Sequence, residues 1–343
     1  MHKLAVSERA RGFATFGINI TRAMPKPLII VNHAAAKARR VWPTIRTQLV
    51  AAGIEFDVHE TQRAGDATSK TRHALRDGVT TIAAVGGDGT LSEVAEGVFV
   101  VNYDDLPVAI NPNAALAIFP AGTGDDFARG LAGNRAPLQF WINQFANHCN
   151  APDNHIRKVD VLYGRCDNFS TPFICINAST MGIGGETATR VAAQGKFMRR
   201  FSGEARFAAA ALVGIARWRE RPVRITIDGS EVIQGEMNLA AVANGLYAGG
   251  GMMLSPDARN DDGKLDVICA SGLSRIEVVR ELGRIHSGGH IGNSKVRIAR
   301  GTYVRIETFA PADAMPIEVD GNVRGFTPVE FRVLPAAINF VCG

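Results

Sequence analysis

The residues with the strongest chemical character are 86-GGDGT-90, where one carboxylate and one hydroxyl stand among three glycines. They follow an apolar, β-branched run at 79–85 that is typical of a buried strand. Apolar residues then recur at helical spacing, at Leu91, Val94, Ala95 and Val98. A helix N-terminus offers unpaired N–H groups and the positive end of the helix dipole, and glycine lets phosphate oxygens approach the backbone. The stretch therefore predicts a phosphate-binding loop, although a tight turn with Asp88 as a helix cap fits the same residues.

Asp88 itself is expected to play another part, because a carboxylate repels phosphate. It would hold Mg²⁺ or accept a proton from a hydroxyl group. A second stretch, 119-FPAGTGDDFARGL-131, repeats the design: an apolar strand at 116–120, then Gly-Thr-Gly, two acids and an apolar helix face. Loops at the carboxyl ends of strands in one sheet form a cleft, so the two stretches are expected to share a site.

The elements that must position these loops alternate between strand and helix from residue 28 onward. Buried strands are predicted at 28–31, 54–59, 79–85 and 116–120. Helices are predicted around Ala38, Trp42, Ile45 and Leu49 and over 68–78, which ends in a C-terminal glycine. This alternation is typical of an α/β half with a mostly parallel sheet.

After about residue 152 the pattern changes to alternating strands separated by turn residues. Strands are predicted at 158–164, 173–179, 223–233, 237–244, 295–299 and 303–309. A hairpin turn is predicted at 228–230, and helices near 190–218 and 274–286. The glycines of 182-GIGGE-186 are interpreted as a bulge or turn between strands. The predicted fold class is therefore α/β plus a β-rich second domain.

Four segments follow from these patterns. Residues 1–27 form a basic N-terminal extension, 28–152 an α/β nucleotide-binding domain and 153–324 a β-rich domain for the second substrate. The apolar tail 325–343 is expected to return to the first domain.

Composition limits the class of partner and compartment. A net charge of +5 favours anionic partners. The five cysteines form no CxxC pair and no zinc-type spacing, which favours a reduced, cytoplasmic protein. No run of 18 apolar residues occurs, and the charged N-terminus does not resemble a signal peptide. No nucleic-acid-binding motif is present, so nucleic acid is not an expected partner.

One segment, 190–224, carries nine basic residues against two acidic ones. Aromatic residues are interleaved with them, and a helical apolar face is predicted at Ala208, Ala211, Leu212 and Ile215. Basic residues and aromatics on amphipathic helices suit an anionic bilayer surface, although a core helix with a solvated basic face fits too. The candidate membrane-contact residues are Phe197, Arg199, Arg200, Phe201 and Trp218.

Four motifs, in this order, resemble the diacylglycerol-kinase catalytic domain family, which includes bacterial diacylglycerol kinases, sphingosine kinases and ceramide kinases. They are 86-GGDGT-90, 120-PAGTGDDFAR-129, 255-SPDARNDDGKLDV-267 and 319-VDGNVRGFTPVEFRVLP-335. The resemblance runs from about residue 28 to 340. It implies a two-domain fold like that of NAD kinase and diacylglycerol kinase. It also implies an ATP- and Mg²⁺-dependent lipid kinase, peripheral on the inner face of the membrane, that phosphorylates diacylglycerol or a ceramide or sphingoid lipid.

The resemblance also assigns candidate site residues. ATP would be lined by Asn32, Thr61, Gly86, Gly87, Asp88, Gly89, Thr90, Gly122 and Thr123. A structural Mg²⁺ would lie on the DDG turn, bound by the Asp262 carboxylate and the carbonyls of Arg259 and Lys264; a solvated, self-bonded turn fits the same residues. The favoured contact for the acceptor hydroxyl is Asp88, with Asp126 and Asp320 as weaker candidates for catalysis.

Three departures from the family pattern bear on chemistry. The early loop is 32-NHAAAK-37 in place of NPxSG, and Asp125 replaces an asparagine. Asn322 stands where the family has the glutamate of DGE, a proposed proton acceptor, and an amide cannot act as that base. Either another carboxylate serves, or little base is needed.

Two other functions stay open at this stage. An NAD kinase shares GGDGT, but its Asn-Glu motif is not found, and 242-VAN-244 is a poor substitute. A catalytically weak nucleotide or lipid sensor would account for Asn322. The acceptor lipid and the oligomeric state, including a homodimer, are not fixed by the sequence.

Overall fold

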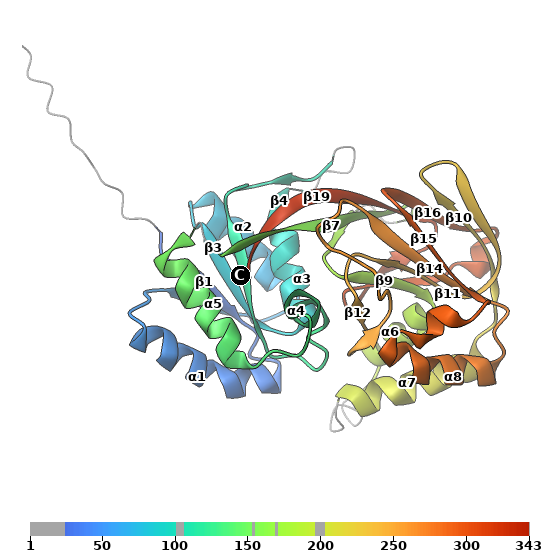
Figure 1. The fold of residues 1–343 in the computed structure, drawn as a ribbon, viewed down its shortest axis with the longest axis horizontal. Helices are drawn as coiled ribbons and strands as arrows, with labels where there is room; N and C mark the ends of the chain where they lie inside the picture. Colours follow the sequence, from blue (N-terminus) through green and yellow to red (C-terminus); the bar gives the residue numbers. More distant parts are fainter. Residues whose placement is uncertain (1–24, 101–105, 153–154, 169–170, 196–202, 343) are drawn as a thin grey trace, which may run out of the picture.

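The computed structural model describes residues 25–100, 106–152, 155–168, 171–195 and 203–342 of the 343-residue chain. Most of the predicted N-terminal extension therefore lies outside the described residues. The described chain forms two lobes, with helices packed around parallel strands in one lobe and long antiparallel strands in the other (Figure 1). No helix in these described ranges is long and apolar enough to cross a membrane.

The first lobe is built on four parallel strands in the order β6-β3-β1-β2. These strands are β1 (Leu28–Val31), β2 (Asp57–Glu60), β3 (Thr81–Gly86) and β6 (Ala115–Pro120). The residues of β1 and β3 are buried throughout, which explains their continuous apolar composition. Two short strands, β4 (Phe99–Val100) and β5 (Val108–Ala109), fall between β3 and β6 in the chain. They pair with each other and not with this sheet.

Five helices accompany these strands. They are α1 (Ala36–Ala51), α2 (Asp66–Arg76), α3 (Asp88–Gly97), α4 (Asp126–Ala132) and α5 (Leu138–Asn150). The chain steps from β1 to β2 in one direction along the sheet and from β2 to β3 and β6 in the other. Because such crossovers are right-handed, α1 covers one face while α2 and α3 cover the opposite face. Contacts of α1 with α5, and of α2 with α3, fit this arrangement.

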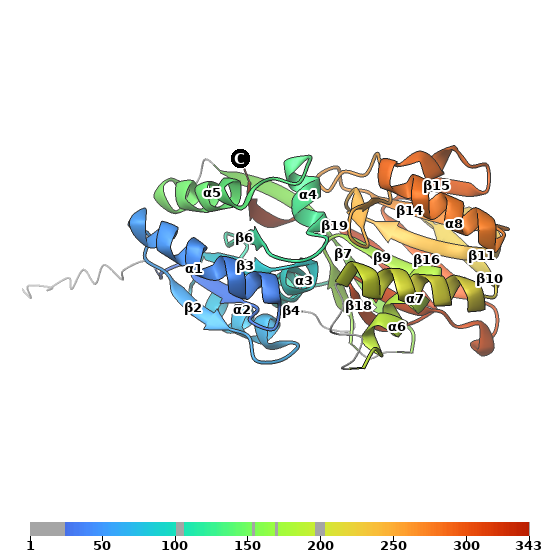
Figure 2. The same cartoon turned by 90° about the horizontal axis from the view of Figure 1, so that it is seen from below.

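The second lobe is mainly antiparallel, with an apolar core enclosed between its strands. Its longer strands are β7 (Ile156–Cys166), β9 (Ala178–Gly182), β10 (Arg221–Ile227), β11 (Glu231–Ala243), β14 (Leu265–Ser271), β15 (Val296–Gly301), β16 (Tyr303–Thr308), β17 (Pro316–Val319), β18 (Asn322–Phe326) and β19 (Val329–Val341). Shorter strands are β8 (Phe173–Cys175), β12 (Tyr247–Ala248) and β13 (Met252–Met253). Its helices are α6 (Ile183–Ala192), α7 (Gly203–Arg217) and α8 (Arg275–Arg284), and α7 lies beside α8 in both views (Figures 1 and 2).

The last strand, β19, joins the two lobes. It pairs antiparallel with β16 and β7 along most of its length. Near its end, after a register shift between Leu334 and Ile338, it pairs parallel with β6 through Asn339 and Phe340. One continuous sheet of fifteen strands results, and Figure 1 shows β19 arching from the second lobe into the first.

Most predicted elements exist, but several boundaries differ. The strand expected at 173–179 is two strands, β8 and β9, and the one expected at 237–244 continues a longer β11. The hairpin turn at 228–230 is confirmed by the pairing of Ile227 with Glu231. The bulge or turn expected at 182–186 is wrong: Gly182, at φ 78°, ends β9, and α6 begins at the next residue.

Candidate active site

The predicted phosphate-binding loop lies where expected, at the carboxyl ends of the parallel strands. Gly86 ends β3, Gly87 is the N-cap of α3, and residues 88–90 form the first turn of this helix. No side chain caps the α3 N-terminus. Its first N–H groups and the positive end of its dipole therefore point into the edge where the strands end, as an anion-binding site requires.

The glycines of the two loops have different roles. A Cβ on Gly87 would lie 2.8 Å from the Gly122 Cα, and one on Gly122 would lie 2.5 Å from the Gly87 Cα. A Cβ on Gly86 would lie 2.4 Å from the Thr90 Oγ1. These three glycines are thus required by contacts within the protein. Gly89 differs, because the nearest atom to a Cβ there is the Nδ2 of Asn322 at 3.6 Å, an ordinary van der Waals contact, so this glycine faces the second lobe and no close contact requires it.

Other predicted ATP-lining residues gather at the same edge. The Nδ2 of Asn32, which follows β1, donates to the Thr90 Oγ1 over 3.0 Å. Thr61 follows β2, and its N–H donates to the Val31 carbonyl over 3.0 Å. Thr123 is exposed on the second loop. The structure thus brings together the residues that sequence motifs proposed, on strands that are adjacent in the sheet.

Asp88 is engaged in a way that the sequence did not indicate. Its two carboxylate oxygens accept the N–H groups of Asp126 at 3.1 Å and Phe127 at 3.0 Å. Asp88 therefore caps the N-terminus of α4, the helix of the other loop, and not its own helix. Burial raises the pKa of Asp88, and the two N–H donors oppose that rise. The expected contact of Asp88 with a hydroxyl or Mg²⁺ would have to use the remaining lone pairs of this carboxylate.

Asp126 joins the two lobes and is only 4% exposed. Its Oδ2 accepts the Gly250 N–H over 2.8 Å, while its Oδ1 is buried and has no hydrogen-bond partner among the described residues. Gly250 lies in the middle of three consecutive glycines with positive φ between β12 and β13. Burial, with the neighbouring charge of Asp88, raises the pKa of Asp126 to about 6. An unsatisfied buried oxygen of this kind is a place where a bound ligand would complete the structure.

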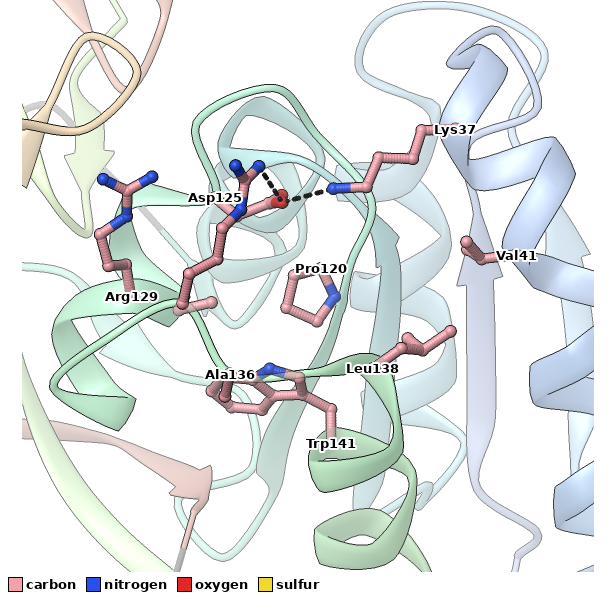
Figure 3. A pocket seen from close by; sticks show the side chains of 10 residues that line it. Lys37, Val41, Pro120, Asp125, Arg129, Ala136, Leu138 and Trp141 are labelled. Carbon is pink, nitrogen blue, oxygen red and sulfur yellow. Dashed lines mark hydrogen bonds and ion pairs between the residues drawn. The ribbon is translucent and has the colours of Figure 1, made fainter.

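Asp125, where the family pattern has asparagine, is paired with a lysine that the sequence analysis passed over. The Lys37 Nζ donates to the Asp125 Oδ2 over 2.9 Å (Figure 3). It also donates to the Gly122 carbonyl over 2.9 Å. The Asp125 Oδ1 accepts the Gly122 N–H over 2.6 Å. Asp125 has a φ of 52°, a left-handed conformation that aspartate and asparagine tolerate best after glycine. The added negative charge is therefore neutralised, and the pair fixes the second glycine loop to α1.

The hollow drawn in Figure 3 lies between α1, α4 and α5, and Lys37 and Asp125 are among the residues that line it. Val41, Pro120, Leu138 and Trp141 form part of its lining, and its volume is about 120 Å³. Ligand pockets for molecules of nucleotide size are several times larger. This hollow is therefore not where the structure would accommodate ATP.

The hairpin of β17 and β18 places the second lobe against α3. The Asp320 carboxylate at its tip, in a left-handed conformation with φ 47°, accepts the N–H groups of Ile176, Asn177 and Ala178 at 2.8–3.1 Å. Further along, Arg324 pairs with Glu96 of α3 over 2.6 Å. Burial raises the pKa of Asp320, and these N–H donors oppose the rise. Asp320 therefore holds the hairpin in place, and its expected catalytic role stays a prediction.

The DDG turn is a self-bonded turn surrounded by arginines. The Asp262 Oδ1 accepts the Lys264 N–H over 3.0 Å, and its Oδ2 lies 3.7 Å from Arg300. Arg259 pairs with Asp261 over 3.2 Å. Nowhere in the described ranges do three or more His, Cys, Asp or Glu side chains gather as metal ligands do. The site that the resemblance assigns uses one carboxylate and two backbone carbonyls, so the Mg²⁺ site at Arg259, Asp262 and Lys264 stays a prediction.

The basic segment is only partly described. Phe197, Arg199, Arg200 and Phe201 lie outside the described residues. Trp218 is half-buried, packs against two apolar clusters and has Arg221 over its ring at 5.3 Å, so its role is packing within the lobe. The predicted apolar face of α7 is also wrong as a single face. Ile215 is 4% exposed and faces inward, whereas Leu212 is 59% exposed and faces outward.

Two further functional residues were missed by sequence reasoning. Lys37 follows a loop of small residues and gave no motif signal. Asp160 is 2% exposed and accepts the N–H groups of Gly263 and Ala336, each over 2.7 Å, so it ties the DDG turn to β19. Its signal was present in the sequence, since a carboxylate in the middle of the apolar run 158–164 must find partners when buried.

Comparisons with known proteins agree with this geometry. Residues 26–162 match the diacylglycerol kinase catalytic domain, and residues 180–342 match the YegS C-terminal NAD kinase beta sandwich-like domain. A protein of Xanthomonas campestris pv. campestris (strain 8004) named as a YegS-like lipid kinase is 32% identical over 283 residues, which cover 82% of this chain and 84% of the relative. A diacylglycerol kinase of Staphylococcus carnosus (strain TM300) is 26% identical over 314 residues, covering 88% of this chain and 90% of the relative.

A solved structure shares the fold. A candidate diacylglycerol kinase from Bacillus anthracis str. Sterne superposes with a TM-score of 0.70 at 23% identity, covering 93% of this chain and 97% of that chain. The two lobes and their site thus define a kinase of the type that combines a diacylglycerol kinase catalytic domain with a YegS-type β-sandwich. The chain belongs to the diacylglycerol kinase family of lipid kinases.

The Lys37–Asp125 pair leads to a prediction about stability. Lys37→Met removes the main partner of a carboxylate that is 4% exposed, so we expect a loss of about 1–2 kcal/mol in the free energy of unfolding. Asp125→Asn in the Lys37→Met background should restore about half of this loss or more, because an amide needs no counter-charge. Urea unfolding of the two single variants and the double variant measures the coupling. Strictly additive losses would show that the pair contributes nothing.

Asp126 leads to a prediction about pH. Its pKa rises from 3.8 in the unfolded chain to about 6 in the folded protein, so the folded state becomes less stable as pH increases through this interval. Asp126→Asn removes the buried charge and should raise the stability at pH 8 by about 2 kcal/mol, with the advantage shrinking toward pH 4. Thermal unfolding at both pH values, in the presence of a chelator, tests this. An equal effect at pH 4 and pH 8 would contradict it.

Proposed function

We propose that this member of the family is an ATP-dependent lipid kinase that transfers the γ-phosphate of Mg²⁺–ATP to a hydroxyl of a membrane lipid. Diacylglycerol is the first acceptor to test, and ceramide or another sphingoid lipid is the alternative. One observation carries the proposal: the uncapped N-terminus of α3 faces the hairpin of the second lobe at Gly89. Phosphate bound there would face an acceptor brought by that lobe.

The protein's contribution to transfer would be mainly positioning and charge neutralisation. The N–H groups of the first turn of α3 would hold phosphate oxygens, and the Asn32–Thr90 hydrogen bond would hold that turn against β1. The buried, unpartnered Oδ1 of Asp126 fits a cation that arrives with the nucleotide. Mg²⁺ would supply neutralisation of the phosphate charge when bound.

The acceptor would come from the membrane. Apolar side chains are exposed on two neighbouring helices, with Leu212 at 59% and Val213 at 43% on α7 and Ile276 at 77% and Val279 at 50% on α8. Exposed arginines flank them at Arg217, Arg219, Arg275 and Arg280. The acids of α8 are already paired, Glu277 with Lys295 and Glu281 with Arg284. We call the exposed faces of α7 and α8 the α7–α8 surface, and its apolar and positive character suits an anionic bilayer on the inner face of the membrane.

The proposed reaction is tested with labelled ATP and mixed vesicles that contain one acceptor lipid at a time. Phosphorylated lipid is expected with at least one acceptor. Gly89→Ala should fold, since the nearest atom to the new Cβ is 3.6 Å away, but the methyl group should obstruct phosphate and lower kcat/KM for ATP about 100-fold. The matched control is Gly235→Ala on β11, away from the α7–α8 surface, where a Cβ meets nothing within 4 Å. Phosphorylation of free NAD with no lipid product would contradict the proposal.

Membrane docking is tested by sedimentation with vesicles of phosphatidylcholine alone or with phosphatidylglycerol added. Binding is expected only to the anionic vesicles and should weaken with added salt. Ile276→Glu and Leu212→Glu place charges on the α7–α8 surface and should each weaken binding about tenfold without loss of fold. Val232→Glu, at a 53%-exposed position on β11, is the control. Equal effects of all three substitutions would show that the α7–α8 surface is not the docking face.

A further inference from the structure

The β17–β18 hairpin has no carboxylate at position 322, but it carries one at Glu318. Asn322 stands at the start of β18 with its amide facing Gly89, and an amide cannot take up a proton at neutral pH. Glu318 lies on β17, the partner strand of the same hairpin. Its carboxylate accepts the Gly321 N–H through one oxygen and the Thr180 hydroxyl, over 2.6 Å, through the other.

The hairpin tip that holds Glu318 is seated on the phosphate-binding helix. A Cβ at Gly89 would lie 3.6 Å from the Asn322 Nδ2 and 3.9 Å from the Asp320 carbonyl oxygen. Gly321, whose N–H binds Glu318, is the single residue between these two contacts. The Glu318 carboxylate is therefore attached to the part of the second lobe that faces the open side of α3.

Two of the other carboxylates near this edge are committed to backbone groups. Asp88 caps α4 with both oxygens, and Asp320 accepts three N–H groups. Asp126 accepts the Gly250 N–H through Oδ2, and its unpartnered Oδ1 is the oxygen that the proposed function gives to a cation. Glu318 accepts the Gly321 N–H and the Thr180 hydroxyl, the Thr180 backbone also acts on it as a hydrogen-bond donor, and it is half-buried.

We propose that Glu318 accepts the proton of the lipid hydroxyl during phosphoryl transfer, the role that Asn322 cannot fill. The inference rests on the proposed lipid kinase function. The hydroxyl oxygen forms a bond to the γ-phosphorus while the bond from that phosphorus to the bridging oxygen of ADP breaks. The hydroxyl proton passes to a Glu318 oxygen, and ADP leaves with the bridging oxygen and its electron pair.

The surroundings of Glu318 suit a proton acceptor near neutral pH. Burial, with the neighbouring charge of Asp320, raises its pKa to about 7, and the Thr180 and Gly321 donors oppose the rise. Cys175 of β8 also lies within electrostatic range, and α6, which covers this face, carries Glu186 paired with Arg190. A base is most effective when its pKa lies near the working pH. Turnover should therefore rise with pH as Glu318 loses its proton.

The experiment compares Glu318→Gln, Asn322→Glu and the double variant in the vesicle assay, with ATP and the best acceptor. Glu318→Gln keeps the shape and an acceptor for the Gly321 N–H, so the fold should persist. We expect it to lower kcat about 100-fold, to leave KM for ATP within about twofold, and to abolish the rise of kcat near pH 7. The double variant carries a carboxylate at position 322, which faces Gly89, and should recover at least about tenfold in kcat.

The matched control is Glu307→Gln, which removes another carboxylate of the second lobe, one that is paired with Arg305 over 3.0 Å. It should leave kcat and the pH profile unchanged. Wild-type-like kcat and pH dependence in Glu318→Gln would overturn the inference. A loss of kcat that Asn322→Glu does not repair would assign Glu318 to hairpin structure and overturn it equally. Failure of the wild-type protein to phosphorylate any lipid would instead refute the proposed function.

Discussion

The whole site depends on the contact between two glycine loops that follow β3 and β6. Gly87 and Gly122 approach so closely that a single Cβ on either would collide with the other's backbone. Asp88 completes the contact by capping α4 from the first loop. Because α4 is fixed in this way, Asp126 reaches Gly250 in the second lobe. The glycine–glycine backbone contact, together with the Asp88 and Asp126 carboxylates, thus sets the relative position of α3, α4 and the neighbouring lobe.

The second lobe contacts this arrangement through the β17–β18 hairpin. The hairpin lies on α3, with Asn322 beside Gly89 and Arg324 paired with Glu96. Catalysis of phosphoryl transfer requires a positioned donor and acceptor more than strong chemistry from the protein. In the proposed reaction, this positioning would be provided at one helix end, to which β3 of the first lobe and the hairpin of the second lobe both contribute. The family's usual glutamate is absent at residue 322, and the available carboxylate of the hairpin is Glu318.

What the sequence predicted well was local. Buried strands were found from apolar runs, and the loop at 86–90 was found because three glycines between a strand and a helical pattern favour close approach to a helix N-terminus. What it missed depends on partners distant in the chain. Asp88 and Asp126 are 38 residues apart, Lys37 and Asp125 are 88 apart, and Asp126 and Gly250 are 124 apart. Spacing and periodicity carry no information on such pairs, so Asp88 was assigned to chemistry and its capping of α4 was not foreseen.

The most direct measurement is a crystal structure of the protein with Mg²⁺ and a non-hydrolysable ATP analogue. The account predicts phosphate oxygens within hydrogen-bond distance of the N–H groups at 87–89, on the side that faces Asn322. The adenine of the analogue should lie toward Thr61, which follows β2. An analogue bound in the hollow between α1 and α5, or phosphates placed away from the α3 N-terminus, would contradict the account.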